Sequence, residues 1–217
     1  TDTIEQKKSR KEFKAILIKR VFCNPYIWIL SIANFFVYTV RFAFLDWGPT
    51  MFQQWLGVSK AQSGWMGGGF ELCGLAGMLL AGWATDKYFK GRAARVCLLC
   101  MLVALAFVGS LWLWRTNDMP ILGSIILLFG VGFFIYGPQA LVGIAASNLA
   151  TKEAAASAVG LTGLFAYAST VLSGWGFGVV ADSYGWNYIF FGLIAAAIVG
   201  TVVFALLWRA KADGYDD

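Results

Sequence analysis

The chain has 217 residues, of which 59% are apolar and 13% are charged, and its formal net charge is +5. Soluble globular domains carry about 25% charged residues, and 17 Lys and Arg with 12 Asp and Glu cannot cover the surface of a soluble protein of this length. The composition therefore excludes a soluble globular protein, a disordered tail and a collagen-like chain. The positive charge predicts no nucleic-acid partner, because the basic residues of a membrane protein collect on one side of the bilayer.

Residues 1–24 combine a run of basic residues with apolar side chains such as Phe13, Ile16 and Val21. This pattern favours an interfacial amphipathic helix on anionic lipid, with a protein-docking segment as the alternative. We expect the segment to be a cytoplasmic connector. Because Thr1 is not an initiator Met, we also expect it to continue from a longer chain.

Six long apolar stretches follow, each long enough at 1.5 Å per residue to cross a hydrocarbon core of about 30 Å. They lie at about 25–49, 61–83, 96–115, 120–147, 154–180 and 186–208. Lipid favours helices because their backbone polar groups are bonded internally, and the alternation of barrel strands is not visible. We therefore predict an all-α polytopic membrane protein, with a six-helix transmembrane bundle over 25–208 and a cytoplasmic tail over 209–217.

The basic residues are distributed unevenly about these stretches. Fourteen of the 17 fall on the side that holds both ends of the chain, Lys60 and Arg115 fall on the other side, and Arg41 lies inside a stretch. The positive-inside rule then places both termini in the cytoplasm. The chain has no His, and Cys97 and Cys100 form a C-x-x-C without a second pair. We expect packing cysteines, no metal, no cofactor and no enzymatic activity.

Arg41 is the most informative residue, because a charge at this depth in a span is costly and faces a partner or a cavity. A guanidinium offers a planar donor fork that suits phosphate or carboxylate. The residue therefore predicts an anion site, with a structural ion pair as the alternative. Tyr38 lies three residues earlier on the same helical face.

Two acids and two groups of polar residues accompany this arginine. Glu71 shares a helical face with Gly67, Gly68 and Gly74, so we expect close packing there and a carboxylate that points into protein. Asp46 lies about 140° round the helix from Arg41, so the two are poorly placed to pair. Arg41 against two acids leaves one negative charge, which predicts a missing half that carries a Lys or Arg. Candidate pore-lining residues are Tyr136 and Gln139 in one span and Thr162, Tyr167, Ser169 and Ser173 in the next, although such hydroxyls often bond back to their own helix.

Five motifs in order carry a family resemblance. They are Y-T-V-R-F-A-F-L-D-W-G-P at 38–49, G-F-E-L-C-G-L-A-G at 69–77, G-W-A-T-D-K-Y-F-K-G-R at 82–92, G-F-F-I-Y-G-P-Q-A-L-V-G at 132–143 and G-L-T-G-L-F-A-Y at 160–167. Together they resemble the carboxyl-terminal half of the organophosphate:phosphate antiporters of the major facilitator superfamily. The resemblance implies spans seven to twelve of a twelve-helix monomer in the bacterial inner membrane, with a homologous amino-terminal half as partner.

The resemblance also implies roles for individual residues. Arg41 matches the arginine that grips the substrate phosphate in this half. Three aromatic residues, Tyr38, Tyr136 and Tyr167, match tyrosines that line the pore, and Gln139 and Thr162 would contact the organic part of the substrate. Two acids, Asp46 and Glu71, match residues that pair with a Lys of the other half. The segment with Asp86, Lys87 and Arg92 resembles the cytoplasmic gating loop.

Three activities stay open at this level. The first is exchange of a sugar phosphate, such as hexose 6-phosphate, for inorganic phosphate by alternating access, or carriage of glycerol 3-phosphate by the same fold. The second is a hexose-phosphate sensor that signals to a membrane histidine kinase. The third is a structural six-helix subunit in which Arg41 only pairs with Glu71. Hexose-phosphate carriers of this type can hold an Asp–Lys pair where this chain has Val159 and Thr162, which leaves the substrate undecided.

Overall fold

The computed structural model describes residues 4–114 and 120–210, with side chains from residue 10 onward. Within these ranges the chain forms helices, connecting turns and no strand. Its elements are α1 (Ile4–Leu17), η1 (Ile18–Phe22), α2 (Pro25–Leu56), α3 (Lys60–Phe89), α4 (Ala93–Trp114), α5 (Ile121–Leu149), α6 (Ala155–Thr170), η2 (Val171–Gly176), α7 (Phe177–Tyr184) and α8 (Trp186–Leu206). Arg115 and the tail from residue 211 onward lie outside the described residues.

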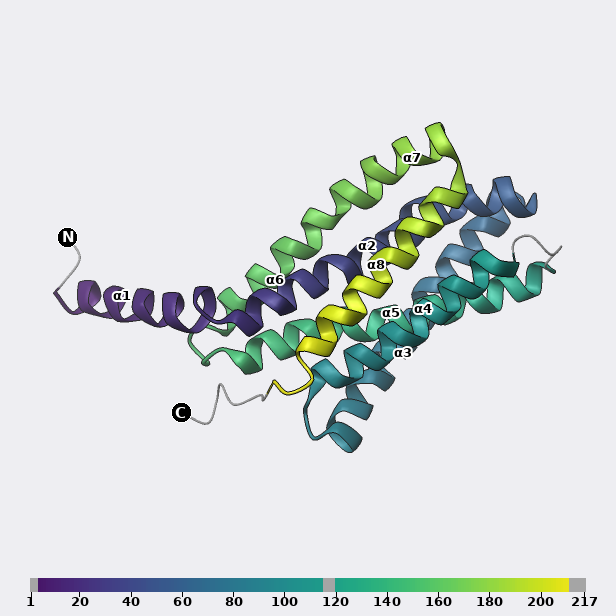
Figure 1. Ribbon diagram of the computed structural model, residues 1–217. Coiled ribbons are helices and arrows are strands. Elements are labelled where there is room, and N and C mark those ends of the chain that lie inside the picture. Colours follow the sequence, from purple (N-terminus) through teal and green to yellow (C-terminus); the bar gives the residue numbers. More distant parts are fainter. Residues whose placement is uncertain (1–3, 115–119, 211–217) are drawn as a thin grey trace.

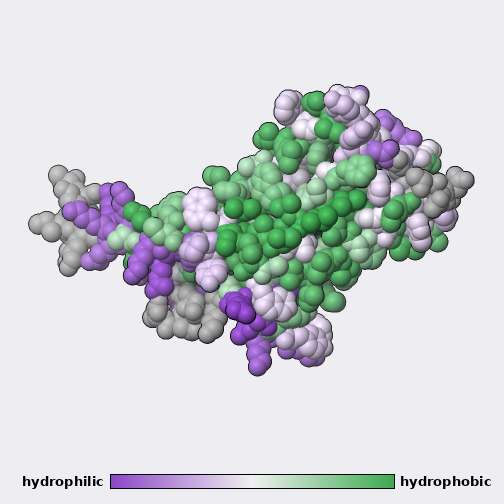
Figure 2. All heavy atoms as spheres, in the orientation of Figure 1, coloured by the Kyte–Doolittle hydropathy of each residue, from purple (hydrophilic) through white to green (hydrophobic). Residues whose placement is uncertain are grey.

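Five of these helical segments are long and apolar enough to cross a membrane. They are Pro25–Leu56, Ala93–Trp114, Ile121–Leu149, Ala155–Tyr184 and Trp186–Leu206. Helix α3 is the sixth long helix, but the charge of Glu71 and its many glycines make it less apolar than the other five. Figure 2 shows the outcome, a largely apolar surface over the middle of the molecule with hydrophilic side chains gathered toward its ends. The predicted all-α polytopic membrane fold is confirmed.

The first two long helices have well-defined ends. Asn24 caps α2 through its Oδ1, which accepts the N–H of Tyr26 at 3.0 Å, and Pro25 occupies the first helical position. The helix runs past Pro49, beyond the predicted end at 49, and stops at Gly57, whose φ of +63° is left-handed. Ser59 then starts α3 with a capping box, in which its Oγ accepts from the N–H of Gln62 and its own N–H donates to Gln62 Oε1.

The long helices pack in pairs, of which α3 with α5, α4 with α5 and α2 with α6 have the largest contacts. Glycine permits the closest of these approaches, because a Cβ at Gly77 of α3 would overlap the backbone carbonyl of Phe133 in α5. One helix turn away, a Cβ at Gly74 would lie 2.6 Å from the ring of Tyr136. These two glycines therefore bring Glu71 and Tyr136, which are carried by the same two helices, close to each other.

The expectation of close packing on the Glu71 face is met only in part. Gly74 is buried, but a Cβ at Gly67 or Gly68 would have nothing within 4 Å. The reason is that α3 meets α5 along the side of Phe70, Gly74 and Gly77, whereas Gly67 and Gly68 lie off this side. In Figure 1, α1 extends away from the bundle at the end where α8 also finishes, and its interfacial role stays a prediction.

Candidate functional site

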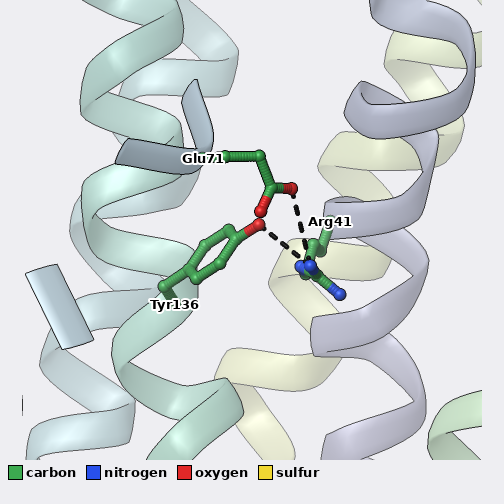
Figure 3. A network of polar contacts seen from close by, with 3 residues as sticks. All are labelled: Arg41, Glu71 and Tyr136. Atoms are coloured by element: carbon green, nitrogen blue, oxygen red, sulfur yellow. Dashed lines mark hydrogen bonds and ion pairs between the residues drawn. The ribbon is translucent and has the colours of Figure 1, made fainter. Parts of the chain in front are cut away.

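Arg41 lies in the middle of the bundle and joins three helices. Its Nη2 donates to the hydroxyl of Tyr136 on α5 at 2.9 Å and lies 3.5 Å from Oε1 of Glu71 on α3. Figure 3 shows the carboxylate and the phenol approaching the guanidinium from the same side. The Arg41 side chain is 15% exposed and that of Glu71 is 40% exposed. The arginine is therefore largely withdrawn into the protein, as expected for an intramembrane charge.

Three aromatic rings surround the same guanidinium. Its Cζ lies 4.7 Å from the ring centre of Tyr136, 5.3 Å from that of Phe42 and 5.9 Å from that of Tyr38. Ring faces at this distance attract a cation without neutralising it. Phe42 was missed by the sequence analysis, although its position directly after Arg41 in an aromatic-rich segment was the available signal.

The donor capacity of Arg41 is only partly used. Both of these contacts employ Nη2, whereas Nε is buried and has no hydrogen-bond partner in the described part of the chain. A guanidinium carries five N–H donors in a fixed plane, and an unsatisfied buried donor costs about 1–3 kcal/mol. Free N–H donors of this kind are chemically suited to an anion with several oxygens, such as phosphate.

Two other predicted pore residues, Gln139 on α5 and Tyr167 on α6, lie next to the aromatic rings around Arg41. The rings of Tyr38 and Tyr167 are 6.3 Å apart, and Tyr167 is 68% exposed, so it borders the site at the open surface of the chain. The side chain of Gln139 lies near the Tyr38 hydroxyl, and its Oε1 is buried without a hydrogen-bond partner among the described residues. The site thus holds an unpaired donor, Arg41 Nε, and an unpaired acceptor, Gln139 Oε1.

Thr162 requires a correction. It is 2% exposed, and its hydroxyl donates to the carbonyl of Val159 in the previous turn at 2.9 Å. Ser169 and Ser173 are also buried and bond back to Ala166 and Ser169. These residues do not line an open surface, because their face of α6 and η2 packs against α2.

The two predicted inter-half acids differ from each other. Glu71 contacts Arg41 within this chain, whereas Asp46 is exposed and makes no hydrogen bond or ion pair with any described residue. Of the two acids, Asp46 is thus the one that no cation of the described residues holds in an ion pair, and its pairing with the other half stays a prediction.

The predicted gating residues lie at the opposite end of α3 from its capping box. Asp86 and Lys87 belong to the last turn of α3, rather than to a loop, and Arg92 follows in the short connection to α4. All three are exposed, and the Lys87 ammonium lies 4.7 Å from the ring centre of Trp83. The helix ends at Lys90, whose φ of +51° is left-handed.

No group of three His, Cys, Asp or Glu side chains is close enough to hold a metal ion in the ranges 4–114 and 120–210. Cys97 and Cys100, the pair in the C-x-x-C motif, are unbridged thiols on α4. The polar and charged groups gathered at the described site are the Arg41 guanidinium, the tyrosines around it, and the nearby Glu71 carboxylate and Gln139 amide.

Comparison with known proteins identifies the fold family. Residues 30–215 match the family model of the Major Facilitator Superfamily. The chain belongs to the major facilitator superfamily. Within this superfamily it is 37% identical over 211 residues to a probable hexose phosphate transport protein of Chlamydia pneumoniae, an alignment that covers 97% of this chain and 45% of the relative.

Two other relatives of this chain are named for different functions. It is 40% identical over 193 residues to the membrane sensor protein UhpC of Escherichia coli, covering 88% of this chain and 43% of that protein. It is 38% identical over 197 residues to a glycerol-3-phosphate transporter of Bacillus subtilis, covering 90% and 44%. The chain thus spans a little under half the length of these relatives, and it is a multi-pass membrane protein similar to transporters and a sensor of phosphorylated substrates.

Proposed function

We propose that this chain is the carboxyl-terminal half of a bacterial twelve-helix antiporter that exchanges a sugar phosphate, hexose 6-phosphate, for inorganic phosphate by alternating access. The observation that carries the proposal is the buried guanidinium of Arg41, whose Nε has no partner among the described residues. Relatives named for hexose phosphate and glycerol-3-phosphate transport support the substrate class. Both termini of the chain lie in the cytoplasm, as the distribution of its basic residues favours.

In this proposal Arg41 binds the substrate phosphate together with a cation from the homologous amino-terminal half. Phosphate carries about −1.5 to −2 charges and three acceptor oxygens, whereas Glu71 offers one charge from 3.5 Å. The anion therefore competes favourably with Glu71 for the guanidinium. Gln139 and Tyr167 bind the organic part of the substrate, because Gln139 Oε1 is an unpaired acceptor that suits a sugar hydroxyl.

Both exchanged anions use the same clamp, which accounts for coupled exchange without a second energy source. A ligand shifts a conformational equilibrium only through different affinities for the two states. The occluded state therefore binds phosphate more tightly than either open state. Asp46, which forms no ion pair with a described residue, pairs with a basic residue of the other half in this proposal. That pair stabilises one of the open states.

The decisive test replaces Arg41 by Lys in the complete transporter. Lysine keeps the charge but loses the planar fork, so we expect phosphate exchange in proteoliposomes to fall by roughly 10²-fold, in proportion to the loss of a charge-assisted bidentate contact of about 2–3 kcal/mol. Arg209→Lys, on the exposed carboxyl-terminal side, is the matched control and keeps wild-type exchange. Normal exchange by the Arg41→Lys protein would overturn the clamp.

A sensor is the second candidate, favoured by the 40% identity to the membrane sensor protein UhpC. Its binding site would hold the same residues, and ligand binding would be transmitted to a histidine kinase in place of net transport. Counterflow assays distinguish the two: a sensor binds hexose 6-phosphate with little or no exchange and changes the activity of a co-reconstituted membrane kinase. Comparison of hexose 6-phosphate with glycerol 3-phosphate in the same assay identifies the organic group.

A further inference from the structure

Helix α2 is joined to the α6–η2–α7 span by two hydrogen bonds from side chains to main-chain carbonyls. Asn34 Nδ2 donates to the carbonyl of Thr162 at 3.0 Å, and Trp47 Nε1 donates to the carbonyl of Ser173 at 2.9 Å. The two helices pack extensively against each other and run in the same direction (Figure 1). The donors are 13 residues apart on α2, which corresponds to about 20 Å along its axis.

The two bonds bracket the functional site. Arg41 lies seven residues after Asn34 and six before Trp47. Between the two bonds the rings of Tyr38 and Tyr167 meet at 6.3 Å. The relative position of these tyrosines and of Arg41 is therefore fixed from both sides, one contact on the cytoplasmic side and one on the outer side.

The bond from Trp47 to the Ser173 carbonyl lies at an irregular turn of the helix. Ser173 belongs to η2, a π-helical segment that interrupts the span after α6. Wider turns of this kind disturb the regular i→i−4 pattern and often accompany function. The Trp47 ring fits closely against the same span, since a Cβ at Gly178 would lie 2.8 Å from its Cζ2. Its indole thus supplies a donor to a carbonyl at the place where the helix is least regular.

The bond from Asn34 to the Thr162 carbonyl comes with a cost in folding stability. Asn34 is 4% exposed, and its Oδ1 has no hydrogen-bond partner in the described ranges. A buried unsatisfied acceptor lowers stability. A leucine at this place would avoid that loss but could not bond to Thr162, so the amide is better explained by its donor contact to α6 than by stability.

The other side of the site belongs to a different helix pair. Glu71 and Tyr136 come from α3 and α5, which are held together by the close approach at Gly77. Helix α2 packs more extensively against α6 than against α3 or α5, although it also packs extensively against α8 and both α2 and α6 contact α5. The contacts of Arg41 with Glu71 and Tyr136 therefore cross a joint between two helix pairs, and an anion that replaces Glu71 acts at this joint.

We propose that Asn34 and Trp47 are positioning residues that lock α2 and the α6–η2–α7 span into one moving unit, which carries Arg41, Tyr38 and Tyr167 and shifts against the α3–α5 pair when an anion binds. The proposal rests on the proposed function for its trigger, but not for the existence of the unit. In this proposal the conformational change occurs where Arg41 meets Glu71, and the contact between α2 and α6 does not change.

Spin-label distances in the complete twelve-helix protein test this division. One pair of labels, at the exposed positions Ile32 and Leu164, spans the unit, and a second pair, at Ile32 and Leu72, spans the joint. We expect inorganic phosphate to change the second distance and leave the first unchanged. A first distance that changes by as much as the second would overturn the proposal.

The double variant Asn34→Ala/Trp47→Phe tests the two bonds. We expect a broader distance distribution between positions 32 and 164 and a maximal exchange rate reduced about tenfold, with the phosphate Kd within about twofold of wild type. The matched control is Ser31→Ala/Trp65→Phe, because the Ser31 hydroxyl bonds to the carbonyl of Ile27 in its own helix and Trp65 is 82% exposed on α3. Unchanged width and rate in the double variant, or equal losses in the control, would refute the assignment.

Two further outcomes separate the proposals. If the double variant does not fold, each single variant is measured in the same way, and a broadened distribution in either supports its bond. If the wild-type protein binds no phosphate, the proposed function fails, but the comparison of the 32–164 distributions between wild type and variants still decides whether the unit exists.

Discussion

At the residue scale, the proposed function makes Glu71 and a bound phosphate compete for one guanidinium, that of Arg41. Arg41 has two potential anionic partners, the resident carboxylate of Glu71 and a bound phosphate, and the Glu71 contact is long at 3.5 Å and half open to solvent. A charged pair of this exposure is weak because solvent screens it. In the proposed function, Glu71 therefore holds Arg41 in place between turnovers without preventing a doubly charged ligand from binding.

This competition predicts the effect of Glu71→Gln. The amide keeps the size and hydrogen-bonding capacity of the side chain but removes the charge that competes with the ligand, so phosphate binds more tightly, by roughly three- to tenfold. Isothermal titration of the reconstituted protein with inorganic phosphate measures the change. Glu153→Gln, an exposed acid in the α5–α6 connection, leaves the affinity unchanged. Weaker binding by the Glu71 variant would mean that the carboxylate supports the ligand site and does not compete with it.

At the element scale, the closest helix pair is held by glycine rather than by large side chains. In lipid, helices associate through close packing, because the surrounding acyl chains are as apolar as their side chains. The overlap that a Cβ at Gly77 would make with the Phe133 carbonyl concerns backbone, which cannot rotate away as a side chain can. The α3–α5 contact thus depends on the absence of one carbon atom.

Gly77→Ala is therefore predicted to separate α3 from α5 and to destabilise the protein by about 1–3 kcal/mol, the usual cost of overpacking. Gly82→Ala lies on the same helix, where a Cβ would have nothing within 4 Å, and it stabilises slightly or has no effect because alanine favours helix more than glycine does. Thermal unfolding in detergent compares the two. Equal melting temperatures of the two variants would show that the contact between α3 and α5 can open without loss of stability.

The helices themselves could be predicted from hydropathy, because each span needs about 20 apolar residues. Their ends were predicted less well, since α2 continues beyond Pro49 to a left-handed Gly57. Arg41 could be predicted because an intramembrane charge is conspicuous, whereas Tyr136 and Tyr167 were connected with it only through the family resemblance. The burial of Thr162 could not, because hydropathy does not specify which face of α6 packs against α2. Likewise, the bonds from Asn34 and Trp47 depend on the register between two helices, which no single-helix pattern contains.

At the scale of the whole molecule, the connections between helices alternate between two ends of the bundle. Helix α3 begins at Lys60 and ends at Phe89, and 30 residues of helix separate these points by about 45 Å. The connection before Lys60 carries few basic residues, whereas the one after Phe89 contains Lys90, Arg92 and Arg95 nearby. Figure 1 shows α1 and the carboxyl-terminal end of α8 at a common end of the bundle. The basic residues thus mark one end, which the positive-inside rule assigns to the cytoplasm.

This orientation is tested with single cysteines at Lys60 and Lys90 in a background whose four native cysteines are replaced by serine. We expect a membrane-impermeant maleimide to label the cysteine at position 60 in intact spheroplasts, whereas the one at position 90 reacts only after the membrane is permeabilised. Both positions are exposed and lie at helix boundaries, so their intrinsic reactivities are similar. The opposite labelling pattern would invert the molecule and place Asp86, Lys87 and Arg92 outside, where they could not form a cytoplasmic gate. Labelling of both positions in intact spheroplasts would contradict α3 as a membrane-spanning helix, and with it the delivery of Glu71 to the depth of Arg41.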